Sequence, residues 1–483
     1  MTPLRILNVC AEFVPLAKSG GLGDVTAALA RHLTATGQDV VTVLPRYGII
    51  AAPPAGAEPV AGPNSLTVGG ANIEYCIFLH DIGPEVGRVF VVDCPELFGD
   101  EIYSSGEPEA HRFVLLCRAA LDLCRALEWS PEIVHCHDWH TALVPALLRE
   151  AARSEPLFTA ASTVLTIHNI GYQGVFSANV LRDTGYEDLL ELTDPVDLAA
   201  DDVNMLKTGV MHADALTTVS PTHAGEIQTP EYGMGLEILL QQRGHRLLGI
   251  LNGVDYALWS PETDPHIDVR YSAETIADKR RNKLALLEEL ALDADVDAPV
   301  LGMVSRLVLQ KGVDLFEAVL PEMLGEQGAR CVVLGTGEPP YTDAMRALAD
   351  EWPDRLAFIE AYDDRMSHRI LAGSDLFVIP SRYEPCGLTQ LYALRYGTVP
   401  VVRKTGGLAD SIRHFDPATG EGNGSVFEDA NADGLRWGLT AALDWYRDPD
   451  AWSRLMANGM SADFSWHHQA PAYEKLYRTL AGK

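Results

Sequence analysis

The sequence predicts an α/β protein built from two Rossmann-like, doubly wound domains that face a central cleft. Its 483 residues are enough for two domains, each with its own core. In both halves, short apolar runs typical of buried parallel strands alternate with amphipathic helical patterns. Several of these strands end in Gly-rich or polar loops just before a helix. We expect domains at residues 1–256 and 257–465, with a final helix at 466–483 that returns to the first domain.

Composition excludes several classes of partner. The formal net charge of −30 argues against binding to nucleic acid or to an anionic membrane surface, whereas a neutral polysaccharide tolerates an acidic exterior. No run reaches the roughly 18 consecutive apolar residues of a membrane-spanning helix. The eight cysteines lack paired spacing, which indicates reduced thiols and a cytoplasmic protein.

The first half opens as a β-α-β unit. Residues 5–12 predict a strand, 13–21 a loop, 22–33 a helix and 39–44 a second strand. For the rest of this half we expect a loop and hairpin turn at 51–70, strands at 73–79, 88–93, 133–137, 162–167, 215–220 and 248–251, and helices at 110–127 and 204–212.

The loop after the first strand reads K-S-G-G-L-G-D over residues 18–24. It is neither a Walker A loop nor a dinucleotide G-x-G-x-x-G. Gly20 and Gly21 at a helix start suit backbone contact with a phosphate or a sugar, with Lys18 as a point charge. Asp24 lies one turn into the helix, where it could face a ligand or merely cap the helix.

Residues 135–140 read H-C-H-D-W-H at a strand end. The stretch does not match the His-x-His-x-Asp-His pattern of metallo-β-lactamase-type hydrolases, because the aspartate stands one position too early. No distant set of ligands completes a metal site either. We therefore expect no metal. An aromatic ring beside polar groups suits a sugar better, with its apolar face on Trp139 and its hydroxyls on Asp138 and His140.

Two later strand ends of this half also carry polar groups. His168 follows the strand at 162–167, and Asn252 follows the strand at 248–251 within N-G-V-D. His168 could be a hydrogen-bonded core histidine, and Asn-Gly is a turn signal first. Their place at strand ends favours a binding site for both.

The second half restarts the pattern after a linker at 259–265. Arg306 and Lys311 flank one strand-to-helix loop, so both cations could reach one diphosphate. Tyr362 follows another strand and could stack on a base. For this half we expect helices at 277–292 and 470–480, and strands at 300–304, 331–334, 356–359, 375–380 and 399–402.

The stretch E-P-C-G-L-T-Q at 384–390 places Glu384 between a buried strand and a helix. Gly387 allows close approach of the backbone to a ligand, and free N–H groups at a helix start favour an anion. An ordinary strand-loop-helix connection is the alternative for this motif alone. The K-T-G-G-L-A-D loop at 404–410 echoes the loop at 18–24 and fits two related halves.

Taken together, these motifs resemble one family closely: bacterial glycogen synthases and plant starch synthases, which are retaining glucosyltransferases of GT-B fold. The resemblance runs from the first loop to past residue 410. It implies ADP-glucose as donor and the non-reducing end of an α-1,4-glucan, glycogen or a maltooligosaccharide, as acceptor. It also implies release of ADP, with no metal and no other cofactor.

The resemblance also implies roles for individual residues. Arg306 and Lys311 would hold the diphosphate and Glu384 would contact the transferred glucose. His168 and Asn252 look like ligands of its outer hydroxyl. The other donor-side residues would be Lys18, Gly20, Gly21, Tyr362, Cys386, Gly387, Leu388 and Thr389. The residues that would line the cleft or contact the acceptor are Asp24, Asp138, Trp139 and His140.

Two positions depart from the pattern of related enzymes. Tyr392 stands where many retaining GT-B enzymes have a second glutamate, and Ala361 replaces a glycine before Tyr362. Without a second carboxylate, front-face transfer is the better expectation than a double displacement. A phosphorylase of this fold, with a lysine such as Lys404 holding pyridoxal phosphate, and a non-catalytic glucan-binding protein are the alternatives. The oligomeric state stays open.

Overall fold

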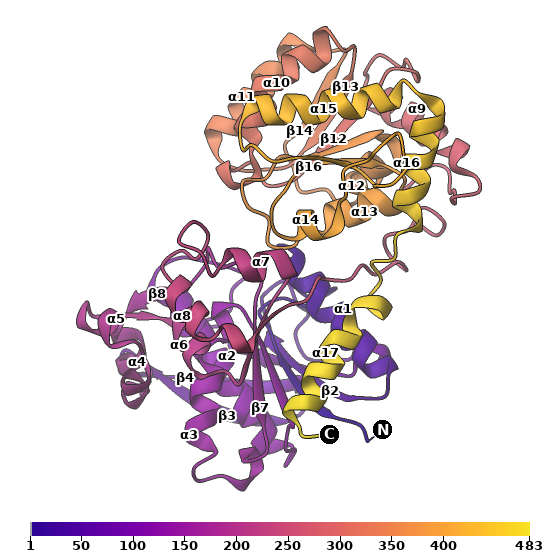
Figure 1. The fold of residues 1–483 in the computed structure, drawn as a ribbon. Helices are drawn as coiled ribbons and strands as arrows, with labels where there is room; N and C mark the ends of the chain where they lie inside the picture. Colours follow the sequence, from indigo (N-terminus) through magenta and orange to yellow (C-terminus); the bar gives the residue numbers. More distant parts are fainter. Residues whose placement is uncertain (1) are drawn as a thin grey trace. The chain divides into compact units, whose positions relative to one another are not determined.

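The computed structural model describes residues 2–483 and divides the chain into two compact units (Figure 1). The first unit comprises Met1–Gly253 together with Trp466–Lys483, and the second comprises Val254–Ser465. Each unit has its own largely parallel sheet with helices between the strands, so the predicted α/β class is confirmed.

The main sheet of the first unit has, within the described residues, nine strands in the order β11-β10-β7-β6-β1-β2-β5-β4-β3. From β11 to β5 all neighbours run parallel, so their carboxyl ends meet at one edge, while β4 and β3 are antiparallel additions. The strands are β1 (Arg5–Val9), β2 (Asp39–Pro45), β3 (Ala61–Val68), β4 (Ala71–Leu79), β5 (Arg88–Asp93), β6 (Ile133–His137), β7 (Ser162–Ile167), β10 (Ala215–Thr218) and β11 (Leu247–Gly249).

The expected loop at residues 51–70 is partly wrong, because its second half forms the edge strand β3. A turn at Gly69 and Gly70, both with positive φ, pairs β3 with β4 and buries Leu66. Pro63 is tolerated because β3 has a neighbour on one side only, and the pairing is irregular between Ala61 and Asn64.

Helices and short elements complete the first unit. They are α1 (Gly21–Ala35), α2 (Glu107–Ala126), α3 (Val144–Ala151), α4 (Asn179–Asp183), α5 (Pro195–Ala199), α6 (Met205–His212), α7 (Pro221–Glu226), α8 (Glu237–Gln242) and the small sheet of β8 (Val175–Ser177) and β9 (Asp202–Asn204).

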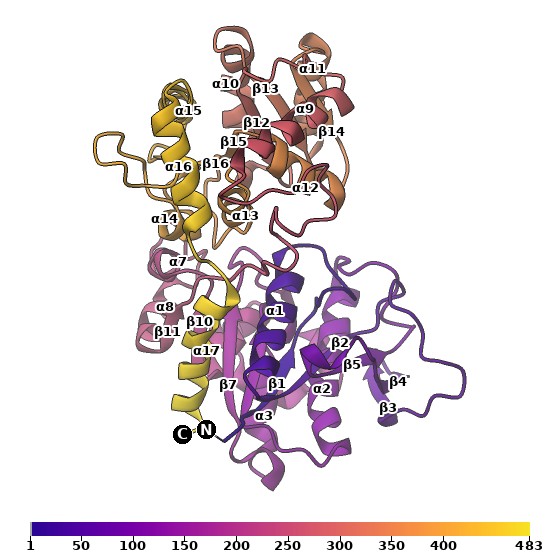
Figure 2. The ribbon, with the colours of Figure 1, turned by 90° about the vertical axis from the view of Figure 1, so that its right-hand side faces the viewer.

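The last helix, α17 (Trp466–Leu480), packs beside α1 in the core of the first unit (Figure 2). Its buried side chains include Tyr473 and Tyr477, and the Tyr477 hydroxyl lies 2.7 Å from Nδ1 of His135 on β6. The Arg478 guanidinium donates to the carbonyl of Thr2, so the two ends of the described chain lie together.

The second unit has a six-stranded, fully parallel sheet in the order β14-β13-β12-β15-β16-β17. Its strands are β12 (Val300–Val304), β13 (Arg330–Leu334), β14 (Leu356–Ile359), β15 (Leu376–Ile379), β16 (Val399–Arg403) and β17 (Ser425–Phe427). Its helices are α9 (Lys279–Glu289), α10 (Val313–Gly325), α11 (Pro339–Glu351), α12 (Asp364–Gly373), α13 (Thr389–Arg395), α14 (Gly406–Ser411), α15 (Ala432–Tyr446) and α16 (Pro449–Ser461).

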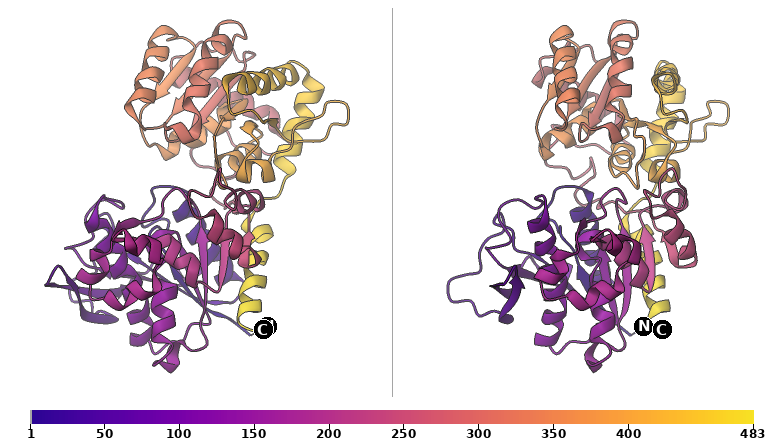
Figure 3. Two further views of the ribbon diagram at one scale, coloured as in Figure 1. Left: turned by 60° about the vertical axis from the view of Figure 1, so that its left-hand side comes forward. Right: turned by 90° about the vertical axis from the view of Figure 1, so that its left-hand side faces the viewer.

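Alternate residues of these strands enter two separate apolar clusters. Leu301 and Val333 pack with α10 and α15, whereas their neighbours Val300 and Val332 pack with α9 and α12. Because successive side chains of a strand point to opposite faces, the sheet is covered by helices on both sides (Figure 3).

Two whole-chain features bear on the expectations from composition. No helix in the described chain is long and apolar enough to cross a membrane. All eight cysteines are free thiols, seven of them buried, and burial raises the pKa of Cys117 to about 12.

Candidate active site

The strongest cluster of sequence-predicted residues in the second unit is centred on Glu384. This buried carboxylate lies after β15, and its Oε2 accepts a hydrogen bond from Lys311 Nζ at 2.6 Å and from Ser381 Oγ at 2.8 Å. Lys311 comes from the loop after β12, so the structure brings two residues 73 positions apart into direct contact. The carboxylate is thereby fixed in one orientation at the carboxyl end of the sheet.

Glycines let the backbones of three strand-end loops touch at this place. Gly312 has φ +66°, and a Cβ there would lie 2.1 Å from the carbonyl oxygen of Pro380. Gly406, after β16, has φ +43°, and a Cβ there would lie 2.0 Å from the carbonyl oxygen of Glu384. Since only glycine permits such approaches, the loops after β12, β15 and β16 form one packed group.

Arg306 lies on the same loop as Lys311 but is exposed. Its Nη2 lies 3.4 Å from Oε1 of Gln310, whose amide nitrogen in turn donates to the carbonyl of Tyr383 at 3.2 Å. Gln310 thus connects the cation to the loop that carries Glu384. A role for Gln310 was not predicted from the sequence, because it depends on a contact between distant loops.

The residues 386–389 form the turn into α13. Gln390 donates from Nε2 to the carbonyls of Cys386 and Gly387 at 3.0 and 2.9 Å. Cys386 is buried, while Gly387, Leu388 and Thr389 are partly exposed. Tyr392, at the position of the missing second glutamate, stacks on Trp259 at 4.0 Å between ring centroids.

Tyr362 follows β14 and is 70% exposed. Stacking of this exposed phenol on a base stays a prediction.

In the first unit, Glu12 organises the K-S-G-G loop. This buried carboxylate, just after β1, accepts hydrogen bonds from the amides of Ser19 at 2.7 Å and Gly20 at 3.1 Å, and from the hydroxyl of Tyr103 at 2.5 Å. Sequence reasoning missed Glu12. An acidic residue at the end of an apolar strand was the available signal.

Lys18 and Asp24 are brought together at the start of α1, with Nζ and Oδ2 3.0 Å apart. Gly20 occupies the N-cap position and Gly21 begins the helix. The lysine is therefore held at the loop by a carboxylate from the first helical turn.

His168 is connected to the centre of the sheet by a hydrogen-bonded series. Its Nε2 lies 2.9 Å from Nδ1 of His137, and Nε2 of His137 lies 2.9 Å from Oδ1 of Asn8 on β1. Burial lowers the pKa of His168 to about 3, so its ring is neutral near pH 7.

His135 and His137 use their ring nitrogens within the protein, whereas Nδ1 of His140 is buried without a hydrogen-bond partner among residues 2–483. His135 contacts Thr166 through Nε2 at 2.6 Å and Tyr477 through Nδ1, and both ring nitrogens of His137 are also engaged.

Asp138 points inward. With φ +55°, it accepts hydrogen bonds from the amides of His168 at 2.7 Å and Asn169 at 3.3 Å. Burial raises its pKa to about 7, although the two amide bonds act in the opposite direction. Asp138 thus positions the loop that carries His168.

Trp139 and His140 are buried in an aromatic cluster. The indole lies 4.2 Å from the ring of His140, 5.1 Å from Phe113 and 5.4 Å from Phe176, measured between centroids. A Cβ at Gly174 would lie only 2.4 Å from the indole. Stacking of a sugar on Trp139 stays a prediction, and it would require one of these neighbours to be replaced.

Asn252 offers an unused acceptor. Its Oδ1 is buried and has no hydrogen-bond partner among residues 2–483. A buried amide oxygen without a partner costs free energy, so a ligand hydroxyl that donated to it would bind favourably.

Comparison with known proteins matches both units to families of sugar-transferring enzymes. A model described as starch synthase catalytic domain matches residues 5–242, and one described as glycosyl transferases group 1 matches residues 290–455.

Full-length relatives have the same architecture. A glycogen synthase of Anaeromyxobacter dehalogenans is 44% identical over 99% of this chain and 100% of its own, and one of Thermotoga maritima is 39% identical over 99% of each. The catalytic domain of starch synthase IV from Arabidopsis thaliana, solved with ADP and acarbose, superimposes with a TM-score of 0.90 at 35% identity over all of both chains. These matches confirm the predicted GT-B fold.

Proposed function

The chain belongs to the family of bacterial glycogen synthases and plant starch synthases, and from this premise we propose its reaction in detail. It transfers glucose from ADP-glucose to the non-reducing end of an α-1,4-glucan, with retention of configuration and release of ADP. The observation that carries the proposal is the fixed Lys311–Glu384 pair beside Arg306, because it combines cations for a diphosphate with an acceptor for sugar hydroxyls.

Cleavage of the glucose–phosphate bond leaves negative charge on the departing ADP. Lys311 has three N–H donors, of which Glu384 takes one. The others, together with the fork of Arg306, can stabilise the diphosphate as this charge develops. The backbone of residues 386–389 supplies further donors next to them.

Glu384 orients the hexose in this mechanism. Ser381 and Lys311 hold one oxygen of its carboxylate, so the group stays fixed while its remaining lone pairs accept from sugar hydroxyls. Fixed acceptors avoid the cost of reorganising during the reaction.

The first unit carries further groups that suit a sugar. The unpartnered Oδ1 of Asn252 and the neutral ring of His168 suit an outer hydroxyl of the glucose. Lys18 and the Gly20-Gly21 loop approach the donor, with the Gly20 amide held by Glu12, and Asp138 and His140 position the acceptor-side loops.

Retention without a second carboxylate favours transfer on one face of the sugar. Tyr392 packs on Trp259 and supplies no carboxylate at this position. A double displacement needs a carboxylate about 5 Å from its partner. The leaving diphosphate itself then accepts the proton of the attacking hydroxyl.

The test is transfer of radiolabelled glucose to glycogen from ADP-glucose and, separately, from UDP-glucose, with and without a chelator. We expect transfer from ADP-glucose, unaffected by the chelator, into product that β-amylase degrades. Transfer only from UDP-glucose would overturn the assignment of ADP-glucose as donor. A product resistant to β-amylase would overturn the assignment of an α-1,4 linkage.

A phosphorylase is disfavoured by the surroundings of Lys404. Its amine pairs with Glu428 at 2.7 Å, and both side chains are exposed. A lysine that holds a cofactor through an imine is usually desolvated. Release of glucose 1-phosphate from glycogen and phosphate would favour that alternative.

A further inference from the structure

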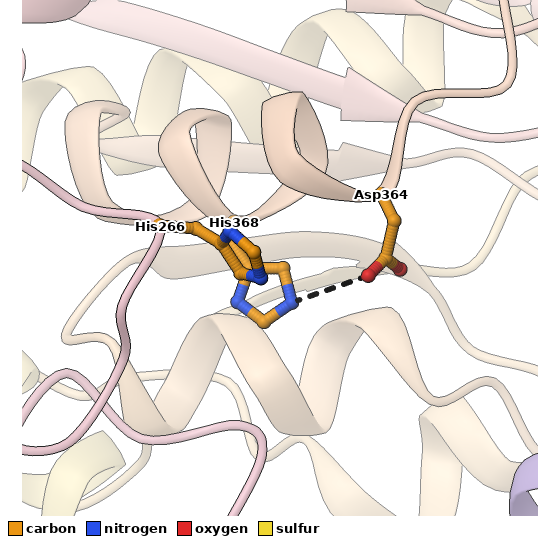
Figure 4. Close-up of side chains that lie close together, drawn as sticks. All are labelled: His266, Asp364 and His368. Carbon is orange, nitrogen blue, oxygen red and sulfur yellow. Dashed lines mark ion pairs between the residues drawn. The ribbon is translucent and has the colours of Figure 1, made fainter. Parts of the chain in front are cut away.

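The second unit contains a cluster of possible metal ligands that the proposed reaction does not use. His266 lies in the segment before α9, and Asp364 and His368 lie one turn apart on α12 (Figure 4). Their ligand atoms all lie within 4.8 Å of one another. We call these residues the His266 cluster.

The ring of His368 is held from two sides. It stacks on Trp259 with centroids 3.9 Å apart and an interplanar angle of 10°, and its Nδ1 lies 2.7 Å from Oδ2 of Asp264. Because a carboxylate accepts, Nδ1 donates to Asp264, which leaves Nε2 as the ring nitrogen that can bind an ion. That nitrogen faces Asp364, with 4.0 Å between Nε2 and Oδ2.

Asp264 also fixes the second histidine. Its side chain is fully buried, its Oδ1 accepts the backbone amide of His266 at 2.8 Å, and its Oδ2 also accepts from the hydroxyl of Tyr396. One carboxylate therefore positions both histidines of the cluster. A carboxylate bound to the outer nitrogen of a histidine is the usual support of a metal-ligating imidazole.

The spacing of the cluster suits an ion between its members. Residues four apart on a helix share one face, so Asp364 and His368 can bind the same ion. Two ligands of a tetrahedral zinc ion lie about 3.3 Å apart, and the exposed Asp364 can rotate to close the present gap.

We propose that the His266 cluster binds one transition-metal dication of the zinc class, through His266, Asp364 and His368, with water at the fourth position. Two imidazoles and one carboxylate are a ligand set that zinc accepts, whereas magnesium and calcium prefer oxygen ligands only.

Such an ion joins two segments distant in sequence. His266 lies near the start of the second unit, and Asp364 begins α12 directly after the loop of Tyr362. A bound ion would fasten these segments to each other and stabilise the amino-terminal end of α12.

The experiment titrates the full chain, freed of metal by a chelator and dialysed, with Zn²⁺ by calorimetry and with Co²⁺ by visible absorption. We expect one site and cobalt bands of a four-coordinate ion with nitrogen ligands. His266→Ala and Asp364→Ala each remove one ligand and should weaken binding about 100-fold or more, beyond the effect of an outer partner. His245→Ala, which removes an exposed histidine elsewhere, should bind as the unaltered chain does.

Asp264→Asn tests the positioning role separately. An amide has one acceptor oxygen, whereas Asp264 uses both of its oxygens to hold His266 and His368, so we expect affinity to fall about 10–100-fold with the cobalt bands shifted. Circular dichroism is the control that measures whether each variant is folded. Equal Zn²⁺ affinity in the unaltered chain, His266→Ala and Asp364→Ala would overturn the proposal, as would loss of the site in His245→Ala.

Discussion

At the scale of single residues, the two cations of the proposed donor site differ in their surroundings. Lys311 is half-buried and paired with Glu384, whereas Arg306 is exposed. Removal of Lys311 would leave a buried carboxylate with one donor fewer, so its effects on folding and on reaction are mixed. Arg306 allows a cleaner test.

We predict that Arg306→Ala lowers kcat by about 100- to 1000-fold, because a donor to the leaving diphosphate is lost. Its free energy of unfolding should change by less than about 0.5 kcal/mol, as for other exposed positions. Steady-state kinetics with the sugar nucleotide and urea unfolding measure the two quantities.

Arg281→Ala serves as the matched control, since Arg281 is an exposed arginine of the same unit on α9. It should leave both kcat and stability near those of the unaltered chain. A kcat for Arg306→Ala equal to that of this control would remove Arg306 from the site.

The residues expected at strand ends were predictable because a parallel sheet gathers its carboxyl ends at one edge. This logic indicated Glu384, Lys311 and His168. The same logic applied to Glu12 at its strand end, but it could not indicate the contact of Glu12 with Tyr103, 91 positions away, or the inward direction of Asp138. Those features depend on long-range contacts that no local pattern encodes.

At the scale of elements, the loops after β12, β15 and β16 depend on glycine at their points of contact. Gly312 and Gly406 combine a positive φ with a backbone oxygen about 2 Å from the place of a Cβ. The shape of the site is therefore set by backbone packing as much as by its charged side chains.

We predict that Gly312→Ala destabilises the second unit and raises KM for the donor. Left-handed backbone costs alanine about 1–2 kcal/mol, and the clash with Pro380 adds about 1–3 kcal/mol. Urea unfolding and initial-rate kinetics provide the measurements.

Gly328→Ala separates the two costs, because Gly328 has φ +70° but nothing within 4 Å of its Cβ position. Gly328→Ala should lose only the stability that left-handed backbone costs alanine, and its KM for the donor should equal that of the unaltered chain. If both variants lost the same stability, loop packing at Gly312 would be unimportant.

The parallel strands and main helices could be predicted from periodicity, since each is a continuous apolar or amphipathic run. The edge strand β3 could not, because its Pro and Gly content is typical of a loop and its pairing with β4 alone makes it a strand.

At the scale of the whole molecule, the first unit buries several neutral histidines. Burial lowers the pKa of His135, His140 and His168 to about 3 and that of His137 well below its usual value. Asp138 is the opposite case, with a pKa raised to about 7 by burial.

These groups predict that stability falls on acidification. Below pH 6.5 the unfolded chain protonates the four histidines and the folded chain does not, which favours unfolding. Asp138 acts in the opposite direction. The folded chain keeps a proton on Asp138 that the unfolded chain releases above its usual pKa, so acidification favours the folded state at this one group. Unfolding therefore takes up protons overall, and the free energy of unfolding should fall as the pH drops below about 6.

Urea unfolding at intervals between pH 7.5 and 4.5 measures this slope. His135→Gln should reduce it by about one proton, while His245→Gln, at an exposed site, should leave it unchanged. Stability independent of pH over this range would show that the buried histidines titrate normally.

The return of α17 to the first unit has a consequence for biosynthesis. Val254–Ser465 is a continuous segment that the ribosome completes before it makes the residues that fill the core around Tyr473 and Tyr477. At about 5–20 residues per second, the nascent first unit waits roughly 10–40 s for its final helix. During this interval the apolar surface that α17 later covers stays exposed, although the strands of this unit were translated first.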